Sequence, residues 1–506
     1  MAMCSTIYFG IIILIPVLGY FINYLFFKES FLRGAQIATI SVWIGFLLGC
    51  IAWTLGWPFS QKVNCAGFIA NEISWLMATL ILFVSAIVHQ FSFRYLAGDR
   101  NYRRYFLSIT AITVSTLVMI ASDNLIFLSV FWLITNFMLV LLMMHKSEWI
   151  AAKNSGFLAC KTFIWGFIFL SLGAGLLAYD AGTFSLHLIL KEHPHSFSYF
   201  RIYGLVFIIL AAFTQSGIWP FHRWLISSLN SPTPVSALMH AGLVNGGGLL
   251  LVRFAVLFLK QEILLDFLFV AGVFTLILGG IWKLIQSNIK RMLACSTMTQ
   301  MGFMIMQCGL GLFSAALAHI CWHGLFKSFL FLRAGAASHE KKHLSEERAS
   351  KISTFFIAAV IGSLGAFGFV FASHFPFVFR ETTTILILFA WMATTQIAHA
   401  ILQKKQDFFL LVISSVVCLI MGLIYGTTIA LIEQVVEPLS ISQPQILHSM
   451  HIVGILCVFC IWLAMNLKSF INQESHVWWR RFYVRMLNSS QPASNTITST
   501  KQGYKF

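Results

Sequence analysis

Apolar runs long enough to cross a lipid bilayer recur along this chain from one end to the other. A membrane-spanning helix needs roughly 20 predominantly apolar residues, and about fifteen segments meet that requirement. They lie near residues 7–27, 36–57, 70–91, 104–121, 123–144, 157–178, 201–224, 235–259, 263–285, 290–314, 316–336, 352–372, 382–402, 408–432 and 447–470. Only 10% of the residues are charged, against about 25% in a soluble domain. The sequence therefore predicts an all-α, polytopic membrane helix bundle.

Lysine and arginine gather in every second loop, a bias that marks the cytoplasmic side of a membrane protein. The richer set of loops includes Arg94, Arg100, Arg103, Arg104 and Lys290. We therefore expect the N-terminus outside the cell and the C-terminus inside, which an odd number of spans also requires. The net charge of +16 follows from the same loops, so the chain is expected to contact membrane lipid and not nucleic acid.

Residues 1–470 are predicted to form one transmembrane domain, and residues 471–506 a cytoplasmic tail. The tail mixes aromatic and basic side chains at Trp478, Trp479, Arg480 and Arg481, which is typical of a helix lying at a membrane surface. The last residues, SSQPASNTITSTKQGYKF, are polar and are expected to be disordered.

The sequence contains no pattern for a cofactor or a metal of its own. Cys457 and Cys460 have the spacing of a CxxC pair, but they lie in an apolar stretch without a second pair, and we interpret them as small core residues. His187, His193 and His195 share one outer loop without the spacing of metal ligands on a helix. No glycine-rich phosphate-binding loop is present, so ATP and dinucleotides are not indicated.

The segment AALAHICWHGLFKSFLFLRAG places Lys327 in the middle of an otherwise apolar run. An ammonium there costs about 2.5–3.5 kcal/mol on insertion scales. His319 and His323 precede it at intervals of four, so the three side chains share one helix face. Burial favours the neutral form of a lysine, and histidine titrates near neutral pH. These residues predict a proton relay; the alternative is a buried polar group kept for helix packing.

A proline-rich stretch from Trp219 to Phe254 predicts an interrupted span. Pro220, Pro232 and Pro234 cannot continue a regular helix. Either the interruption lines a wet cavity and places His240 beside it, or the prolines only form a cytoplasmic turn. The glycines that follow, GGG, are expected to allow close helix packing.

Lys290 begins a span that continues with the polar residues Ser296, Thr297, Thr299 and Gln300. The lysine is either an ordinary flanking charge or a member of a hydrated channel, which the polar residues after it favour.

Three other basic residues have open interpretations. Lys161 lies just inside the sixth predicted span, where its side chain either joins the relay or reaches back to the cytoplasmic surface. His89 and His399 stand alone near predicted helix ends and are interpreted as interfacial. No acidic residue lies deep in a span, so the sequence identifies no counter-ion for Lys327.

The segments PTPVSALMHA, NIKRMLACSTMTQMGF and HICWHGLFKSFLFLRAG resemble the antiporter-like proton-translocating subunits of respiratory complex I and of Mrp antiporters. FSFRYLAGDRNYRRYF and SDNLIFL also fit, and the resemblance covers roughly residues 70–340, the core of the predicted domain. Within that family the chain is most similar to the DabB subunits of DAB energy-coupled inorganic carbon pumps. The resemblance implies the fold of an antiporter-like subunit with broken helices.

The resemblance also implies an ion-translocation relay made of His240, Lys290, His319, His323 and Lys327, which match the family's motif positions. Two positions depart from the family pattern. Leu133 stands where complex I subunits have a glutamate, and Gln215 stands where they have a lysine. The charged pair of those subunits is therefore missing, and either Lys161 or a partner could supply the charge.

The resemblance implies a cell-membrane protein that conducts H⁺ or Na⁺ and energises CO₂ uptake as bicarbonate. Catalysis would belong to a cytoplasmic, zinc-containing partner similar to carbonic anhydrase, DabA, so this chain would be a transporter subunit and not an enzyme. The alternatives are a proton-translocating subunit of a complex I or Mrp assembly, and a scaffold that conducts no ions.

Overall fold

The computed structural model describes residues 5–27, 30–191, 198–335, 352–375, 378, 380–403, 407–467 and 477–497. Throughout these ranges the long regular elements are helices, which confirms the all-α prediction. Fourteen of them, one being a broken pair, are long and apolar enough to cross a membrane. They are α1 (Ser5–Phe26), α2 (Phe31–Thr54), α3 (Glu72–Tyr95), α4 (Tyr102–Ala121), α5 (Leu125–Met143), α6 (Ile150–Ala181), α8 (Tyr199–Ser216), α10 (Thr233–Ala241) with α11 (Gly246–Arg253), α13 (Glu262–Ile285), α15 (Phe313–Arg333), α16 (Ile352–Ser373), α17 (Thr383–Leu402), α18 (Phe408–Val436) and α19 (Ser449–Asn466).

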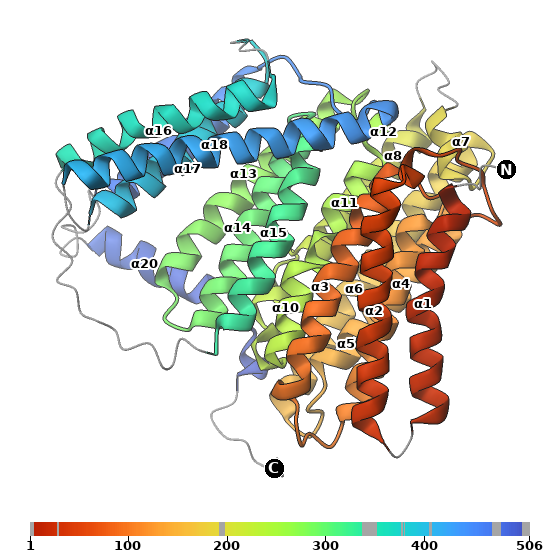
Figure 1. The fold of residues 1–506 in the computed structure, drawn as a ribbon. Coiled ribbons are helices and arrows are strands. Elements are labelled where there is room, and N and C mark those ends of the chain that lie inside the picture. Colours follow the sequence, from red (N-terminus) through yellow and green to blue (C-terminus); the bar gives the residue numbers. More distant parts are fainter. Residues whose placement is uncertain are drawn as a thin grey trace.

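The predicted span at 290–314 corresponds to α14 (Ile289–Gly309), a long helix that is less apolar than the fourteen and is not among the helices apolar enough to cross a membrane. It lies beside α13 and α15 in the bundle (Figure 1). Its first turn is fixed by Asn288, whose side-chain oxygen accepts a hydrogen bond from the Arg291 amide at 3.2 Å, as helix N-caps commonly do. The polar residues that lower its hydropathy are those that the sequence places after Lys290.

Small residues bring α13 and α14 into close contact. A Cβ atom at Gly302 of α14 would lie 2.5 Å from the backbone nitrogen of Leu276 and 2.8 Å from the carbonyl oxygen of Gly272, both on α13. Only glycine permits backbones to approach this closely, a packing mode common between membrane helices. The contact holds the polar face of α14 in a fixed position next to α15.

The interruption of the eighth span lies later in the sequence than the prolines. Pro232 precedes α10 and Pro234 lies in its first turn, where a proline is tolerated. The helix breaks instead at Gly242, and the 3-10 turn η3 (Leu243–Asn245) joins α10 to α11. The break therefore exposes backbone groups in the middle of a span that is mostly buried.

The C-terminal helices form a separate layer. α16, α17 and α18 pack against one another and lie steeply inclined to the bundle of α1 to α15 (Figure 1). α19 packs against α13. Cys457 and Cys460 of α19 are exposed, so their interpretation as core residues was wrong; an apolar surface is normal where a helix faces lipid.

The first part of the tail is helical, as predicted, whereas the part after it is not disordered. α20 (Val477–Ser489) is a helix without buried residues, and α20 contacts α13. Residues 490–497, expected to be disordered, are docked across the ends of α6, η2 (Ser228–Asn230) and α14. Ser490 is 1% exposed and Thr496 is 4% exposed. Residues 498–506 lie outside the described ranges.

Side-chain hydrogen bonds explain why this polar segment is ordered. Their donors and acceptors are Gln286 Nε2 to Ser490 Oγ at 2.7 Å, Arg291 Nη1 to Gln491 Oε1 at 3.0 Å, Asn154 Nδ2 to the Asn495 carbonyl at 2.7 Å, and Asn230 Nδ2 to the Thr496 carbonyl at 2.9 Å. A polar segment of this composition would be disordered on its own. In this fold its polar groups are ordered because they form hydrogen bonds with the ends of helices that are distant in the sequence.

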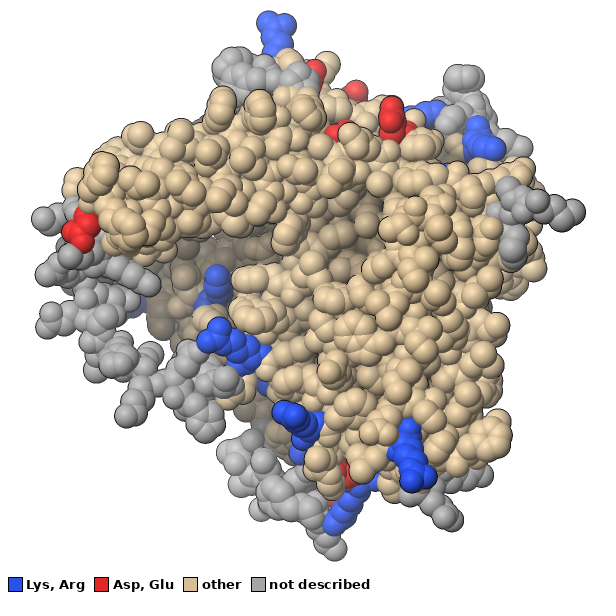
Figure 2. All heavy atoms as spheres, in the orientation of Figure 1, with Lys and Arg blue, Asp and Glu red and all other residues tan. Residues whose placement is uncertain are grey.

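The two ends of the bundle differ in the sign of their charged side chains. On the face shown in Figure 2 most lysines and arginines lie at the end where α14 begins, and most acidic residues lie at the opposite end. We call these the basic end and the acidic end. The distribution follows the loop bias in the sequence; that the basic end faces the cytoplasm remains a prediction.

Candidate functional site

α15 aligns three ionisable side chains inside the protein. His319, His323 and Lys327 are 8%, 4% and 1% exposed. The two imidazole rings are nearly parallel, with centroids 5.8 Å apart and an interplanar angle of 18°. The prediction from their spacing, that they share one buried face of one helix, is confirmed.

The helix break at η3 lies against this face. His323 Nδ1 is 3.0 Å from Asn245 Oδ1, and Asn245 Nδ2 donates to the Ala241 carbonyl at 2.8 Å. Because the Asn245 oxygen can only accept, His323 carries its proton on Nδ1 in the neutral form. His323 Nε2 is then a free acceptor, and it is buried without a hydrogen-bond partner within the described ranges. This nitrogen is therefore available for an incoming proton.

Lys327 reaches the polar face of α14. Its Nζ donates to Ser296 Oγ at 2.9 Å. In the part of the chain that the structure describes, no ion pair joins Lys327 to a carboxylate. A buried ammonium without an opposing charge is readily deprotonated, so the surroundings suit a lysine that alternates between two charge states.

His240 of α10 interacts electrostatically with both lysines of the site. It is 1% exposed, its ring stacks on Phe331 of α15 with centroids 4.2 Å apart, and its Nδ1 has no described hydrogen-bond partner. The charges of Lys327 and Lys290 both act on it. A protonated His240 would therefore be repelled by both ammonium groups, so it would release its proton readily, as a transient proton carrier must.

Lys290 lies at the basic end. Its Nζ donates to the Ser231 carbonyl at 3.2 Å, and the side chain is half-buried. Ser231 directly follows η2, to which the C-terminal segment is docked. We call His240, Lys290, His319, His323 and Lys327 the relay cluster.

Lys161 is not part of the relay cluster. The structure places its side chain on the exposed face of α6, beside Trp165, which is 55% exposed. Hydropathy could not predict this, because α6 is apolar on its lipid-facing side as well as on its buried side. This exposure separates Lys161 from the buried residues of the relay cluster; that its ammonium reaches the cytoplasmic surface stays a prediction.

A neutral amide pair lies near the positions where the sequence departs from the family pattern. Asn136, one helical turn after Leu133, donates from Nδ2 to Gln215 Oε1 at 2.9 Å. Gln215 Nε2 in turn donates to the Leu243 carbonyl at the helix break, at 3.0 Å. Asn136 was not predicted as a site residue, although an amide three residues after Leu133 lies on the same side of a helix.

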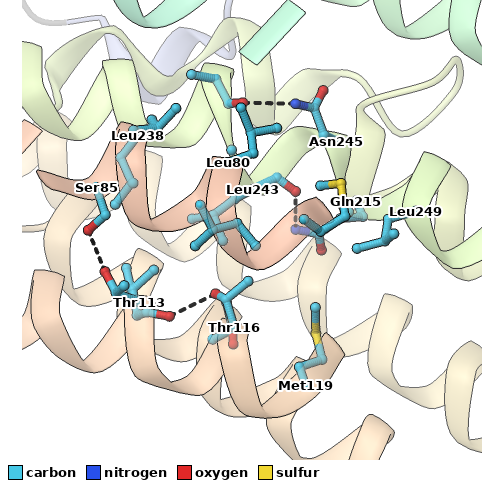
Figure 3. A pocket seen from close by; sticks show the side chains of 18 of the residues that line it. Leu80, Ser85, Thr113, Thr116, Met119, Gln215, Leu238, Leu243, Asn245 and Leu249 are labelled. Atoms are coloured by element: carbon cyan, nitrogen blue, oxygen red, sulfur yellow. Dashed lines mark hydrogen bonds between the residues drawn. The ribbon is translucent and has the colours of Figure 1, made fainter. Parts of the chain in front are cut away.

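A cavity of about 50 Å³ lies between α3, α4, α5, α8 and the α10–η3 break. Figure 3 shows Ser85 and Thr113 facing one another on one wall, and Gln215 and Asn245 across the cavity from them. The lining is mostly apolar with a few polar groups. Asn245 therefore contributes to both the cavity and the relay cluster.

His89 is not the interfacial residue that the sequence predicted. It is 0% exposed and forms hydrogen-bond contacts with Ser85 of α3 and Thr110 of α4. No local sequence pattern indicates this burial, because the hydrogen-bond partner on α4 follows only from how the two helices pack.

No group of three potential metal ligands occurs within the described ranges. His187 lies in the short helix α7 (Leu186–Lys191), whereas His193 and His195 lie outside those ranges.

Comparison with known proteins places the chain among membrane antiporter subunits. Residues 122–351 match the family model "NADH:quinone oxidoreductase/Mrp antiporter, TM". Residues 63–106 match "NADH-Ubiquinone oxidoreductase (complex I), chain 5 N-terminus". The matched ranges include every member of the relay cluster.

Two curated relatives are described as probable inorganic carbon transporter subunits. DabB1 of Halothiobacillus neapolitanus is 32% identical over 404 residues, which are 72% of each chain. DabB of Bacillus anthracis is 33% identical over 419 residues, 81% of each chain. Among solved structures, the Mrp complex from Dietzia sp. DQ12-45-1b matches with a TM-score of 0.59 and 19% identity, over 96% of this chain and 52% of that chain. The last likeness shows a shared fold.

Proposed function

Since this chain belongs to the family of DabB membrane subunits, within the wider group of complex I and Mrp antiporter subunits, we propose that it conducts H⁺ or Na⁺ to energise inorganic carbon uptake. The observation that carries the proposal is the buried line of His319, His323 and Lys327 on α15, joined at His323 to the helix break. Ionisable residues inside a membrane span mark ion or proton pathways by default.

The proposed route begins at the basic end. Lys290 lies there beside Ser231, His240 follows inside the protein, and Lys327 and His323 continue along α15. Three ring nitrogens on this route, His240 Nδ1, His323 Nε2 and His319 Nε2, are buried without a described partner. Buried polar atoms of this kind require a proton, a water molecule or a ligand to satisfy them.

The partner would be a soluble subunit similar to DabA, bound at the basic end and carrying a zinc-dependent, carbonic-anhydrase-like activity. CO₂ and water would become bicarbonate and a proton in that partner, and no residue of this chain would act on CO₂. Ion passage would change the charge of the relay cluster, and that charge would bias the partner's conformation. Coupling of this type requires a two-state element that both subunits influence.

The proposal is tested by growth of a carbonic-anhydrase-deficient cell at low CO₂, with this chain and its partner expressed together. We expect Lys327→Ala and His323→Ala to assemble with the partner but to abolish bicarbonate uptake. Lys161→Ala is the matched control, because it removes an exposed lysine outside the relay cluster. Normal uptake in both relay variants would refute the proposed route.

The family models also name complex I, which makes a proton-translocating subunit of a quinone oxidoreductase the second candidate. Its charged glutamate–lysine pair has neutral counterparts here, since Leu133 and Gln215 occupy the two positions and Gln215 is bonded to Asn136. Purification of the assembled complex discriminates between the candidates. A carbonic-anhydrase-like partner supports carbon uptake, and flavin and iron–sulfur proteins support the second candidate.

A further inference from the structure

His89 is a buried imidazole that the proposed route does not use. It lies on α3 within the membrane-spanning bundle and is 0% exposed. Ionisable groups in such positions are rare, because an unsatisfied polar group at membrane depth is costly, and those that persist commonly have a function. The hydrogen bonds around the ring indicate what this function is.

Both charge states of His89 can be fully hydrogen-bonded. Nδ1 lies 2.8 Å from the Ser85 carbonyl, which only accepts, so Nδ1 carries a proton. Nε2 lies 3.1 Å from Thr110 Oγ1, which also lies 2.7 Å from the Phe106 carbonyl. If Thr110 donates to that carbonyl, Nε2 must donate to Thr110, and the ring is the imidazolium. If the Thr110 hydroxyl turns to Nε2, the ring is neutral.

Hydroxyl groups connect His89 to the cavity. Ser85 Oγ lies 3.2 Å from His89 Nδ1 and 2.6 Å from Thr113 Oγ1. Ser85 and Thr113 both line the cavity, and Figure 3 shows the bond between them on its wall. A chain of groups that each donate and accept can pass a proton from the ring to the cavity.

Two unsatisfied atoms belong to residues of the same cavity. Trp132 Nε1, a donor, and Asn136 Oδ1, an acceptor, have no partner among the described residues, and both residues are at least nine-tenths buried and line the cavity. A water molecule needs about 10–15 Å³ of such space and two to four polar partners. The cavity of about 50 Å³ exceeds this volume, and its far wall is Asn245, which is bonded to His323.

We propose that His89 is a second proton-holding residue, joined to the relay cluster through Ser85, Thr113 and water bound in this cavity. The inference rests on the proposed proton conduction. In the imidazolium, Nδ1 turns its proton from the Ser85 carbonyl to Ser85 Oγ and releases it there; Ser85 passes its own proton to Thr113, and Thr113 passes its own to a cavity water. Nδ1 then accepts a hydrogen bond from the Ser85 hydroxyl, and the proton left on the ring is the one that Nε2 donates to Thr110. Each hydroxyl ends neutral, and one proton is delivered to the cavity, whose wall at Asn245 adjoins His323.

The test measures proton uptake by the purified complex in proteoliposomes under an imposed pH gradient. His89→Gln keeps a donor and an acceptor but cannot be protonated, and Thr113→Val removes the hydroxyl while keeping the shape. We expect each to slow proton uptake about a hundredfold or more, the scale of losing a positioned proton-transfer group, with partner binding unchanged. His399→Gln is the matched control, since His399 is also buried (6% exposed) but lies on α17 away from the cavity.

A second readout separates proton transfer from a structural role. Infrared difference spectra should lose a protonated-imidazole band in His89→Gln, and neither Thr113→Val nor the control should lose it. Uptake at the wild-type rate in Thr113→Val, or in a folded His89→Gln, would overturn the inference. If His89→Gln does not fold, Thr113→Val alone decides. If Lys327→Ala stops proton uptake while His89→Gln and Thr113→Val take up protons normally, only this inference fails. If the wild-type complex conducts no protons, the proposed function fails as well.

Discussion

Replacement of Lys327 by methionine should abolish transport and yet leave the protein at least as stable as the wild type. Methionine has a similar length and no charge, so it fills the same buried space on α15. The variant therefore separates the functional need for the ammonium from the energetic effect of burying it.

The expected magnitude follows from the surroundings of Lys327. Its side chain is 1% exposed, and its described hydrogen bond is the one to Ser296 Oγ. An ammonium within a span costs about 2.5–3.5 kcal/mol, whereas a hydrogen bond to a charged group contributes about 1.5–3 kcal/mol. Lys327→Met removes both the cost of the buried ammonium and its hydrogen bond to Ser296. The free energy of unfolding should therefore rise by between about zero and 2 kcal/mol. The Ser296 hydroxyl can turn to the carbonyl four residues before it.

Two measurements on the same preparation give the result. Thermal unfolding of the purified complex reports stability, and bicarbonate uptake in cells reports transport. Lys161→Met is the control, because it is exposed and should change the free energy of unfolding by less than about 0.5 kcal/mol. A strongly destabilised Lys327→Met would contradict the reasoning, since it would mean that the lysine holds the helices together. Unchanged uptake would contradict it equally.

Three further changes test other parts of the fold by thermal unfolding. Gly302→Ala places a Cβ 2.5 Å from a backbone atom of α13 and should destabilise by about 1–3 kcal/mol, whereas Gly280→Ala, with open space around it, should not; equal effects would refute the close-packing argument. Asn230→Ala removes two hydrogen bonds, one of them to the docked C-terminal segment. It should lower the free energy of unfolding by about 1–3 kcal/mol and increase protease cleavage of that segment. Unchanged cleavage would show that docking of the segment does not depend on Asn230. Burial lowers the pKa of His145 and the Asp99 carboxylate opposes this shift, so the folded state loses stability as pH falls below the unfolded value of about 6.5. Asp99→Asn should enlarge that loss between pH 8 and pH 5, and a loss equal to that of the wild type would refute it.

Hydropathy and helical spacing predicted the spans and the α15 face. The runs of about 20 apolar residues leave few alternatives to membrane helices, and intervals of four place His319, His323 and Lys327 on one side of any helix. The helix α14 was predicted as a span from its length, but it is less apolar than the fourteen helices that can cross a membrane. These features depend on residues close together in the sequence.

Features that depend on packing between distant segments could not be predicted. The exposure of Lys161 and the burial of His89 both follow from which side of a helix faces its neighbours, and a uniformly apolar helix gives no sign of this. Asn154 and Asn495 are bonded although 341 residues separate them. The polar composition of the tail indicates disorder only as long as those remote partners are unknown.

The docked segment at residues 490–497 also links the helix ends around Lys290 to one another. It is bonded to Asn230 of η2 and to Arg291 of α14, and Lys290 donates to Ser231, the residue directly after η2. A molecule that displaced this segment would therefore alter the surroundings of Lys290 without contacting the lysine itself.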